Sequence, residues 1–363
     1  MATGRSMPRY QEWQAHVEPI TFKRIYLNPL RLAQAIGYVT PLRQTYVRFI
    51  HFETPLSIVQ QPVAVGRGFW VSWSEAMQVE QVEHNSTVFS SHLANLLYYL
   101  NGWTLPHENV ELSLGISGTS CGLDWPVSLR VGFYRHLPKI DFIKKFRHTQ
   151  GGVNEWKLTP TTCCMIASLF PSLRSINWCL EEEPPRNYIT RAEVRNTFAA
   201  ALVWVPSSVR SFTLAYYYCW MRAFGDFSVD PQSRAPDLLS IALRQLSKRL
   251  EKVVLSMDIG HEFFIGNDSS AEETDWLRMR EVTVIAGSRT PQEDALFNFD
   301  DETQSAIPIP GMVNPYYLAA GRAAAGMPNL SFLTIHWALC FNTALFYVVR
   351  KDTLGARLFV TGT

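Results

Sequence analysis

The chain has 363 residues, of which 47% are hydrophobic and 13% aromatic, so it is long enough to bury a sizeable core. Its formal net charge of +1 and charged fraction of 18% give no electrostatic footprint for nucleic acid or an anionic membrane. Residues 1–9 are polar and have no apolar signal-peptide core, and the apolar stretch 338–349 is too short to span a bilayer. The composition therefore predicts neither a nucleic-acid partner nor a membrane partner.

The six cysteines lie at positions 121, 163, 164, 179, 219 and 340, and none belongs to a Cys-x-x-Cys pair. A long chain with scattered cysteines is typical of a reduced, intracellular protein, so we expect a cytoplasmic or nuclear location. Cys163 and Cys164 are neighbours on an expected helix, where thiols usually pack as small hydrophobes. No cofactor and no metal site is predicted.

In the first half of the chain, residues 1–17 form a polar lead-in. Period-two apolar runs predict strands over 22–27, 47–52 and 110–114, and a weaker one over 140–146. A helix is expected over 29–38, and a second over 90–101, where Ser90 can supply the N-cap. Residues 57–82 are irregular and are interpreted as an insertion or a degenerate repeat.

In the second half one spacing recurs, in which an apolar residue is followed three and five positions later by two others. It predicts five strands, at 173–178, 209–214, 250–255, 279–284 and 330–335. Eight of these apolar side chains are expected to be buried on strands: Leu173, Ile176, Phe212, Leu214, Val253, Val282, Leu333 and Ile335. Predicted helices alternate with these strands, the last beginning at Asn314-Pro315, and 298–312 is predicted to be a flexible loop.

Neither a helix nor a strand of this kind can bury its apolar face alone, so successive helix–strand units must stack. The sequence therefore predicts an α/β fold, a leucine-rich-repeat-like solenoid or horseshoe with a curved, mostly parallel sheet and outer helices. We expect a single repeat domain over 1–363.

Several short segments also suggest a family: 18–27, 110–114, 170–173, Asp258 with Phe263-Phe264, and 327–330 with Trp337. They resemble a fungal family of F-box-associated, leucine-rich-repeat-like proteins, from about Trp13 to the end. Members commonly begin with an F-box, which recruits the adaptor of a cullin ubiquitin ligase. No Leu-Pro-x-Glu-Ile type opening precedes Glu18, so the resemblance implies a cullin adaptor only if an F-box is present elsewhere. It implies no catalytic residues.

Two segments could carry chemistry. Residues 118–122 match the nucleophile-elbow pattern around Ser120, but 123–126 do not begin a helix well, which favours a glycine-rich loop. Asp258, His261 and Glu262 lie close together and could bind a metal or act as acid and base. The second histidine of the zinc-protease motif is missing, which favours a solvated loop start. The acidic run 181–183 is likewise expected to be a solvated loop.

Tyrosines 216, 217 and 218 just past a strand end cannot all face one core, so at least one is expected to be exposed, although packing between repeats is an equal alternative. Because strand side chains alternate, residues between the buried ones should form a row across the concave sheet face. The row is Tyr26, His51, Asn177, Thr213, Val254, Thr283 and Thr334, and its rim is Tyr216, Tyr217, Asp258 and Trp337.

We therefore expect a non-enzymatic protein–protein interaction module whose partner docks on this face, with a possible role in substrate recognition for a cullin-type ubiquitin ligase. The alternatives are a serine hydrolase built around Ser120 and a structural scaffold without a ligase link.

Overall fold

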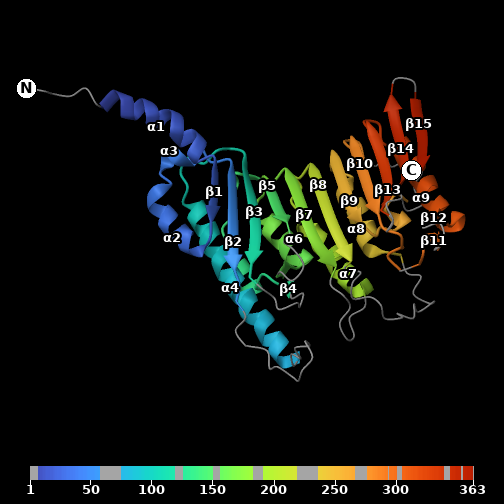
Figure 1. The fold of residues 1–363 in the computed structure, drawn as a ribbon, viewed down its shortest axis with the longest axis horizontal. Coiled ribbons are helices and arrows are strands. Elements are labelled where there is room, and N and C mark those ends of the chain that lie inside the picture. The colour runs from blue at the N-terminus through green and yellow to red at the C-terminus, as the bar shows by residue number, and fades with distance from the viewer. Residues whose placement is uncertain are drawn as a thin grey trace, which may run out of the picture. The chain divides into compact units, whose positions relative to one another are not determined.

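The computed structural model describes residues 7–57, 75–118, 126–149, 156–182, 191–218, 236–265, 276–292, 294–300, 305–338, 344–352 and 355–362. The chain divides into two compact units, Met1–Leu173 and Arg174–Thr363, where the sequence predicts a single domain. Both units combine helices with a mostly parallel sheet, so the fold is mixed α/β (Figure 1). Among the described helices, none combines the length and apolar character that a bilayer crossing requires.

The first unit holds a parallel sheet with the strand order β1-β2-β3-β5. The sheet strands are β1 (Arg24–Leu27), β2 (Phe49–Pro55), β3 (Val110–Ser117) and β5 (Ile143–Thr149). The helices are α1 (Met7–Thr21), α2 (Pro29–Tyr38), α3 (Pro41–Gln44), α4 (Glu75–Asn101), α5 (Val131–Tyr134) and α6 (Pro160–Ser168). Two short strands, β4 (Pro126–Val127) and β6 (Lys157–Leu158), pair with each other.

The second unit holds a sheet with the order β7-β8-β9-β10-β13-β14-β15. The strands from β7 to β13 are parallel, and β14 and β15 continue the sheet antiparallel. The sheet strands are β7 (Ser175–Glu182), β8 (Ser211–Tyr218), β9 (Lys252–Met257), β10 (Glu281–Ala286), β13 (Phe332–Ala338), β14 (Ala344–Asp352) and β15 (Gly355–Gly362). The helices are α7 (Arg191–Ala201), α8 (Leu238–Ser247) and α9 (Pro310–Ala325), with 3-10 turns η1 (Leu202–Trp204) and η3 (His261–Phe263). A small hairpin joins β11 (Phe297–Asp300) to β12 (Ser305–Pro308).

Local sequence explains where several helices begin. Asn28 accepts a hydrogen bond from the amide of Arg31 at 2.8 Å, and Pro29 occupies the first helical position of α2, where no amide donor is needed. Asp237 caps α8 in the same way through the amide of Ser240 at 2.9 Å. Such caps lie in the sequence next to the helix they start, which is why α2 has the predicted bounds.

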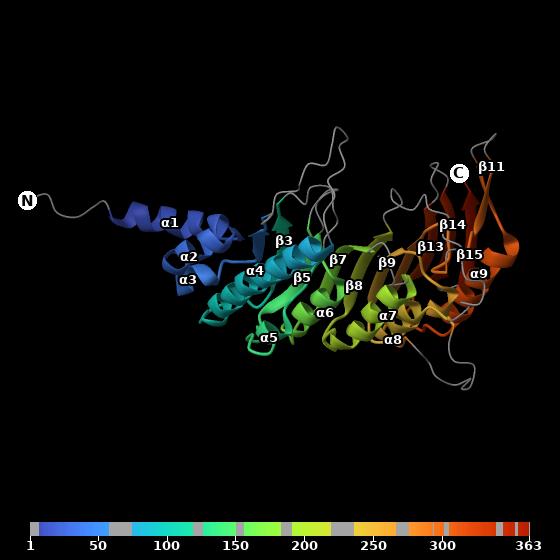
Figure 2. The same ribbon diagram turned by 90° about the horizontal axis from the view of Figure 1, so that it is seen from below.

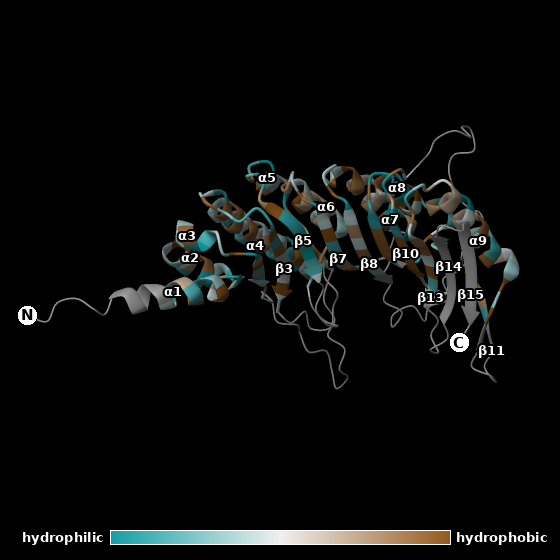
Figure 3. Ribbon diagram, turned by 90° about the horizontal axis from the view of Figure 1, so that it is seen from above, coloured by the Kyte–Doolittle hydropathy of each residue, from teal (hydrophilic) through white to brown (hydrophobic). Residues whose placement is uncertain are grey.

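In each unit most of the helices lie along one face of the sheet, whereas α1 extends beyond the sheet edge (Figure 2). The strand residues whose side chains face the helices are buried. Along each strand, hydrophobic and hydrophilic residues tend to alternate, as the colours in Figure 3 show. All eight side chains predicted as core are buried. Seven lie on strands, whereas Leu173 lies in the turn before β7, where its amide donates to the carbonyl of Phe170 at 2.9 Å.

The structure corrects several expected boundaries. Helix α4 begins at Glu75 and includes 75–82, and Ser90 lies inside it with its hydroxyl on the carbonyl of Ser86 at 2.6 Å, so Ser90 is not a cap. Residues 58–74 lie outside the described part.

Other corrections concern segments expected to lack regular structure. The lead-in is helical from Met7 as part of α1. The expected loop 298–312 contains most of β11, all of β12 and the first turn of α9, which begins at Pro310 rather than Asn314. Residues 216–218 belong to β8.

Candidate functional site

We call the sheet face away from the described helices the open face, and in the first unit it carries an aromatic cluster. The strand register aligns Tyr26 with His51, His51 with Ser113, and Ser113 with Arg147. Tyr26 is 52% exposed although it is a large aromatic residue. Its position on the open face is the one that the sequence predicts from strand alternation.

Contacts within this cluster fix the orientation of its rings. The Tyr26 ring lies 6.1 Å from that of Phe49 and 5.7 Å from that of His51, measured between centroids. Arg24 places its guanidinium carbon 4.6 Å from the centre of the Phe49 ring. His51 Nδ1 lies 3.2 Å from the hydroxyl of Ser113 on the neighbouring strand, and this contact fixes the orientation of the histidine ring. The result is an ordered, half-exposed group of aromatic and basic side chains, which we call the Tyr26 cluster.

The open face of the second unit carries a row of mostly small polar side chains. Its register aligns Asn177 with Thr213, Thr213 with Val254, Val254 with Thr283, and Thr283 with Thr334. This is the row that the sequence predicts. Asn177 is exposed, the next three are half-buried, and Thr334 is 8% exposed, which makes it part of the packed end of the row.

The predicted rim of this face is largely corrected by the structure. Tyr216 is 1% exposed and packs edge-to-face on Phe198, with ring centroids 5.4 Å apart. Trp337 is fully buried, and its Nε1 donates to the hydroxyl of Tyr317 at 3.0 Å. The side chain of Tyr217 lies outside the described part. Tyr216 and Trp337 therefore belong to the core, because both have the parity of the helix-facing strand positions.

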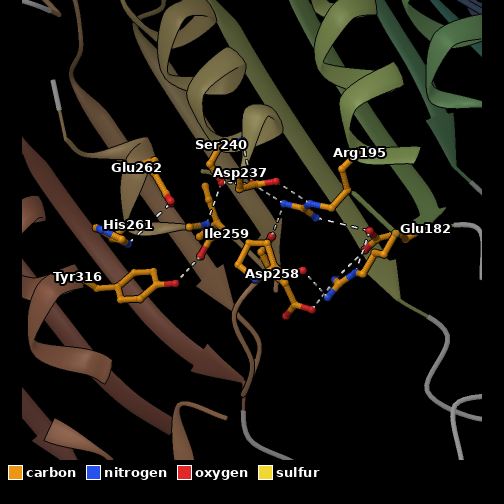
Figure 4. A network of polar contacts seen from close by, with 12 residues as sticks. Glu182, Arg195, Asp237, Ser240, Asp258, Ile259, His261, Glu262 and Tyr316 are labelled. Carbon is orange, nitrogen blue, oxygen red and sulfur yellow. Dashed lines mark hydrogen bonds and ion pairs between the residues drawn. The ribbon is translucent and has the colours of Figure 1, made fainter. Parts of the chain in front are cut away.

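Asp258, the remaining rim residue, belongs to a buried ion network at the carboxyl end of the second unit's parallel strands (Figure 4). Arg191 Nε and Nη2 donate to the two oxygens of Glu182 at 3.0 and 2.8 Å. The same Nη2 lies 2.8 Å from Oδ2 of Asp258. Arg191 thereby ties the end of β7 to the residue after β9, with both of its partners at least nine-tenths buried.

A second guanidinium extends the network toward α8. Arg195 Nε and Nη2 donate to the two oxygens of Asp237 at 2.9 and 2.7 Å, and Nη2 also reaches the backbone carbonyl of Asp258 at 3.0 Å. Its Nη1 lies 3.6 Å from Glu182. Asp237 also accepts from the hydroxyl of Ser240, which in turn accepts from the amide of Gly260 at 2.8 Å.

Two glycines make room for carboxylates beside this network. A Cβ at Gly287, just after β10, would collide with Oδ1 of Asp258. A Cβ at Gly260 would collide with Oε2 of Glu262. A side chain at either position would force the neighbouring carboxylate to move, and the sequence does not reveal this close approach.

Burial and pairing act in opposite directions on these groups. Burial raises the pKa of Asp258, and the nearby Arg191 only partly offsets this. Burial also acts to raise the pKa of Asp237, but the hydrogen bonds and charge of Arg195 outweigh it and lower the pKa overall. Both guanidiniums are held by protein carboxylates, so the arrangement supports a structural role rather than anion binding.

The sequence contains signals for this network, although the acidic run 181–183 was interpreted as a solvated loop. Glu182 was expected in a solvated loop, yet it is 1% exposed, because it shares the parity of Ile176, Trp178 and Leu180 on β7. Arg191 and Arg195 are four residues apart and so share one face of α7. The expected solvated loop at Asp258 is likewise replaced by a buried, paired carboxylate.

The candidate chemical groups are not assembled into a catalytic site in the described part. His261 Nδ1 lies 3.7 Å from Glu262, and the described residues contain no group of three or more His, Cys, Asp or Glu placed to hold a metal ion.

Cys163 and Cys164 are buried free thiols, as expected, and burial raises the pKa of both. Ser120 lies outside the described residues, so a hydrolase around it stays a prediction, testable by labelling with a serine-reactive probe and a Ser120→Ala control.

No protein-family model matches the chain, and neither does any curated protein. Among solved structures, an endo-beta-1,6-glucanase aligns at 8% identity and a TM-score of 0.23, over 91% of this chain and 84% of that one. A similarity at that level carries no argument about fold or activity.

Proposed function

We propose that the chain is a protein-interaction module that binds a protein partner on the open face of its sheet. The observation that carries this proposal is the Tyr26 cluster of the first unit. A tyrosine and an arginine lie beside further aromatic rings there, and such residues are enriched at interface hot spots. The rings are already oriented by their mutual contacts and by Ser113, so little side-chain entropy would be lost on binding.

The small polar row of the second unit supports the same proposal for its own open face. Asn177, Thr213 and Thr283 offer hydrogen-bonding groups on a surface without bulky side chains in the row. Short polar side chains let a partner approach the sheet closely.

The finer proposals follow from the repeated helix–strand units and the family resemblance. We propose that these units stack as a leucine-rich-repeat-like solenoid, supported by the parallel register of successive strands within each unit. We also propose that the partner is a substrate for ubiquitin ligation in the case where an F-box accompanies this chain.

The decisive experiment replaces Tyr26 with a photo-crosslinking phenylalanine analogue in cells and identifies the proteins captured. The matched control carries the same analogue at Tyr38, which is 66% exposed on α2. We expect a protein captured from position 26 and not from position 38. With that protein purified, Tyr26→Ala should weaken binding about 30-fold, the equivalent of about 2 kcal/mol, while Tyr38→Ala leaves it unchanged.

Equal capture at both positions, or unchanged affinity in Tyr26→Ala, would contradict the proposal. Recovery of a cullin adaptor in the same complexes would support the ligase role, and a partner without an adaptor would leave a plain interaction module.

A further inference from the structure

A buried polar layer closes the core of the first unit at the carboxyl end of its strands. The core-facing stripe of α4 is apolar at Leu100, Leu97, Leu93 and Phe89, and then becomes polar at Asn85, one turn nearer the start of the helix. Asn85 is fully buried. A buried amide that continues an apolar stripe departs from the binary pattern of a core helix.

The strands opposite α4 change character in the same direction. On β2 the inner positions are Ile50, Phe52 and then Thr54, and on β5 they end with Phe146 and then His148. Thr54 and His148 are each 1% exposed. Both sides of the core thus become polar where the parallel strands end.

Two hydrogen bonds fix the position of α4 along its axis relative to this end of the sheet. Gln81, one turn before Asn85, donates its amide to the carbonyl of Ser57 at 2.9 Å, three residues beyond Thr54. Ser86, next to Asn85, accepts from the amide of Ser128 at 3.2 Å, just after β4. Asn85 therefore lies at the level of the last residues of β2.

Within the described part of the chain, these three side chains retain polar atoms without a hydrogen-bond partner. They are both amide atoms of Asn85, the hydroxyl of Thr54 and Nε2 of His148. Nδ1 of His148 lies 2.9 Å from the carbonyl of Leu114, to which it donates, so the unpartnered Nε2 of the neutral ring is an acceptor. Leaving a buried polar group unpaired is unfavourable, and buried polar groups in folded proteins are normally satisfied.

We propose that this layer is a binding site for a small neutral hydrogen-bonding molecule, held by Asn85, Thr54 and His148. Their unpaired atoms offer an amide donor, a hydroxyl and two acceptors, which match water or a small molecule with hydroxyl groups. Carboxyl ends of parallel strands are also where α/β proteins usually bind ligands. This inference is independent of the proposed protein partner.

The occupant is expected to be neutral because the three side chains proposed to hold it, Asn85, Thr54 and His148, carry no charge. The buried polar residues of the described part of this unit include no Asp or Glu, so a cation would lack a carboxylate. Burial lowers the pKa of His148 to about 4, so its ring is neutral and does not attract an anion.

The test measures unfolding of the full chain by urea for Asn85→Leu and for the matched control Asn95→Leu, on the exposed side of the same helix. If a bound molecule bridges the layer, Asn85→Leu leaves Thr54 and His148 without their hydrogen-bond partner. The substitution should then raise the unfolding equilibrium constant by about tenfold or more relative to the control. If the layer is empty, leucine replaces an unpaired amide, and an unchanged or lower unfolding constant overturns the proposal.

A crystal structure that resolves ordered water, with native mass spectrometry of the same protein, identifies the occupant. Density bonded to at least two of the three side chains supports the site. Without added mass it is water, and with added mass it is a retained small molecule. Direct hydrogen bonds among the three side chains with no density between them would overturn the proposal.

Discussion

The two units bury polar groups at the same place, the carboxyl end of their parallel strands, but by different chemistry. In the second unit, Arg191 and Arg195 from α7 meet the carboxylates of Glu182, Asp237 and Asp258. In the first unit, the polar side chains at that level, Asn85, Thr54 and His148, are neutral and leave atoms unpaired. A buried charge is stabilised by a nearby opposite charge, and among the described residues α7 supplies the two arginines that do this in the second unit.

The largest expected change in the free energy of unfolding comes from removing one guanidinium of the buried network, which tests the comparison most directly. Arg195→Met should destabilise the protein by about 3–5 kcal/mol, because Asp237 and Glu182 would stay buried with less compensating charge. Urea unfolding measures the change. Arg278→Met, at an exposed arginine, is the control and should have little effect. A loss as small as that of the control would mean that the network adds nothing to stability.

A smaller expected effect is a difference between the two units in how their contribution to the free energy of unfolding depends on pH. The folded state holds the pKa of His148 at about 4 against its ordinary value of 6.5, because burial disfavours the charged ring. Between these values the unfolded chain takes up a proton that the folded chain does not, so stability falls as pH falls. The shift corresponds to about 3 kcal/mol between pH 7 and pH 4.

Urea unfolding across this range should therefore show a pH slope that His148→Gln reduces. His84→Gln, at an exposed position on α4, should keep the slope. Asp258 in the second unit acts in the opposite sense, since its raised pKa makes its contribution less favourable as pH rises above 3.8. An unchanged slope in His148→Gln would show that the buried histidine is not the titrating group.

The smallest effect contrasts the buried network with an ion pair on the open face. Lys252 and Glu281 are aligned on neighbouring strands with Nζ 2.5 Å from Oε2, but their side chains are 48% and 35% exposed. Lys252→Ala should cost no more than about 1 kcal/mol, because solvent screens the pair. A double-mutant cycle with Glu281→Ala isolates the interaction, and a coupling as large as that of Arg195 would refute the distinction between buried and exposed pairs.

The sequence by itself determined the local features of this protein. Alternation within a strand depends only on neighbouring residues, so the spacing of Ile176, Phe212, Val253 and their counterparts predicts which side chains are buried and which face outward. The start of α2 follows from Asn28-Pro29. The row from Asn177 to Thr334 has the predicted register, since each strand pairs with its neighbour at the same position relative to its buried apolar residues.

Only the tertiary structure decided which polar residues are buried and with what they pair. The guanidinium of Arg195 reaches Asp237 across 42 residues of sequence, and Gly287 leaves space for Asp258, and neither relation is visible in local periodicity. Tyr216 and Trp337 have the parity of the buried strand positions, but only the fold shows that the rings of Phe198 and Tyr316 pack against them. The antiparallel strands likewise depend on tertiary pairing, of β14 with β13 and of β15 with β14, which no local pattern specifies.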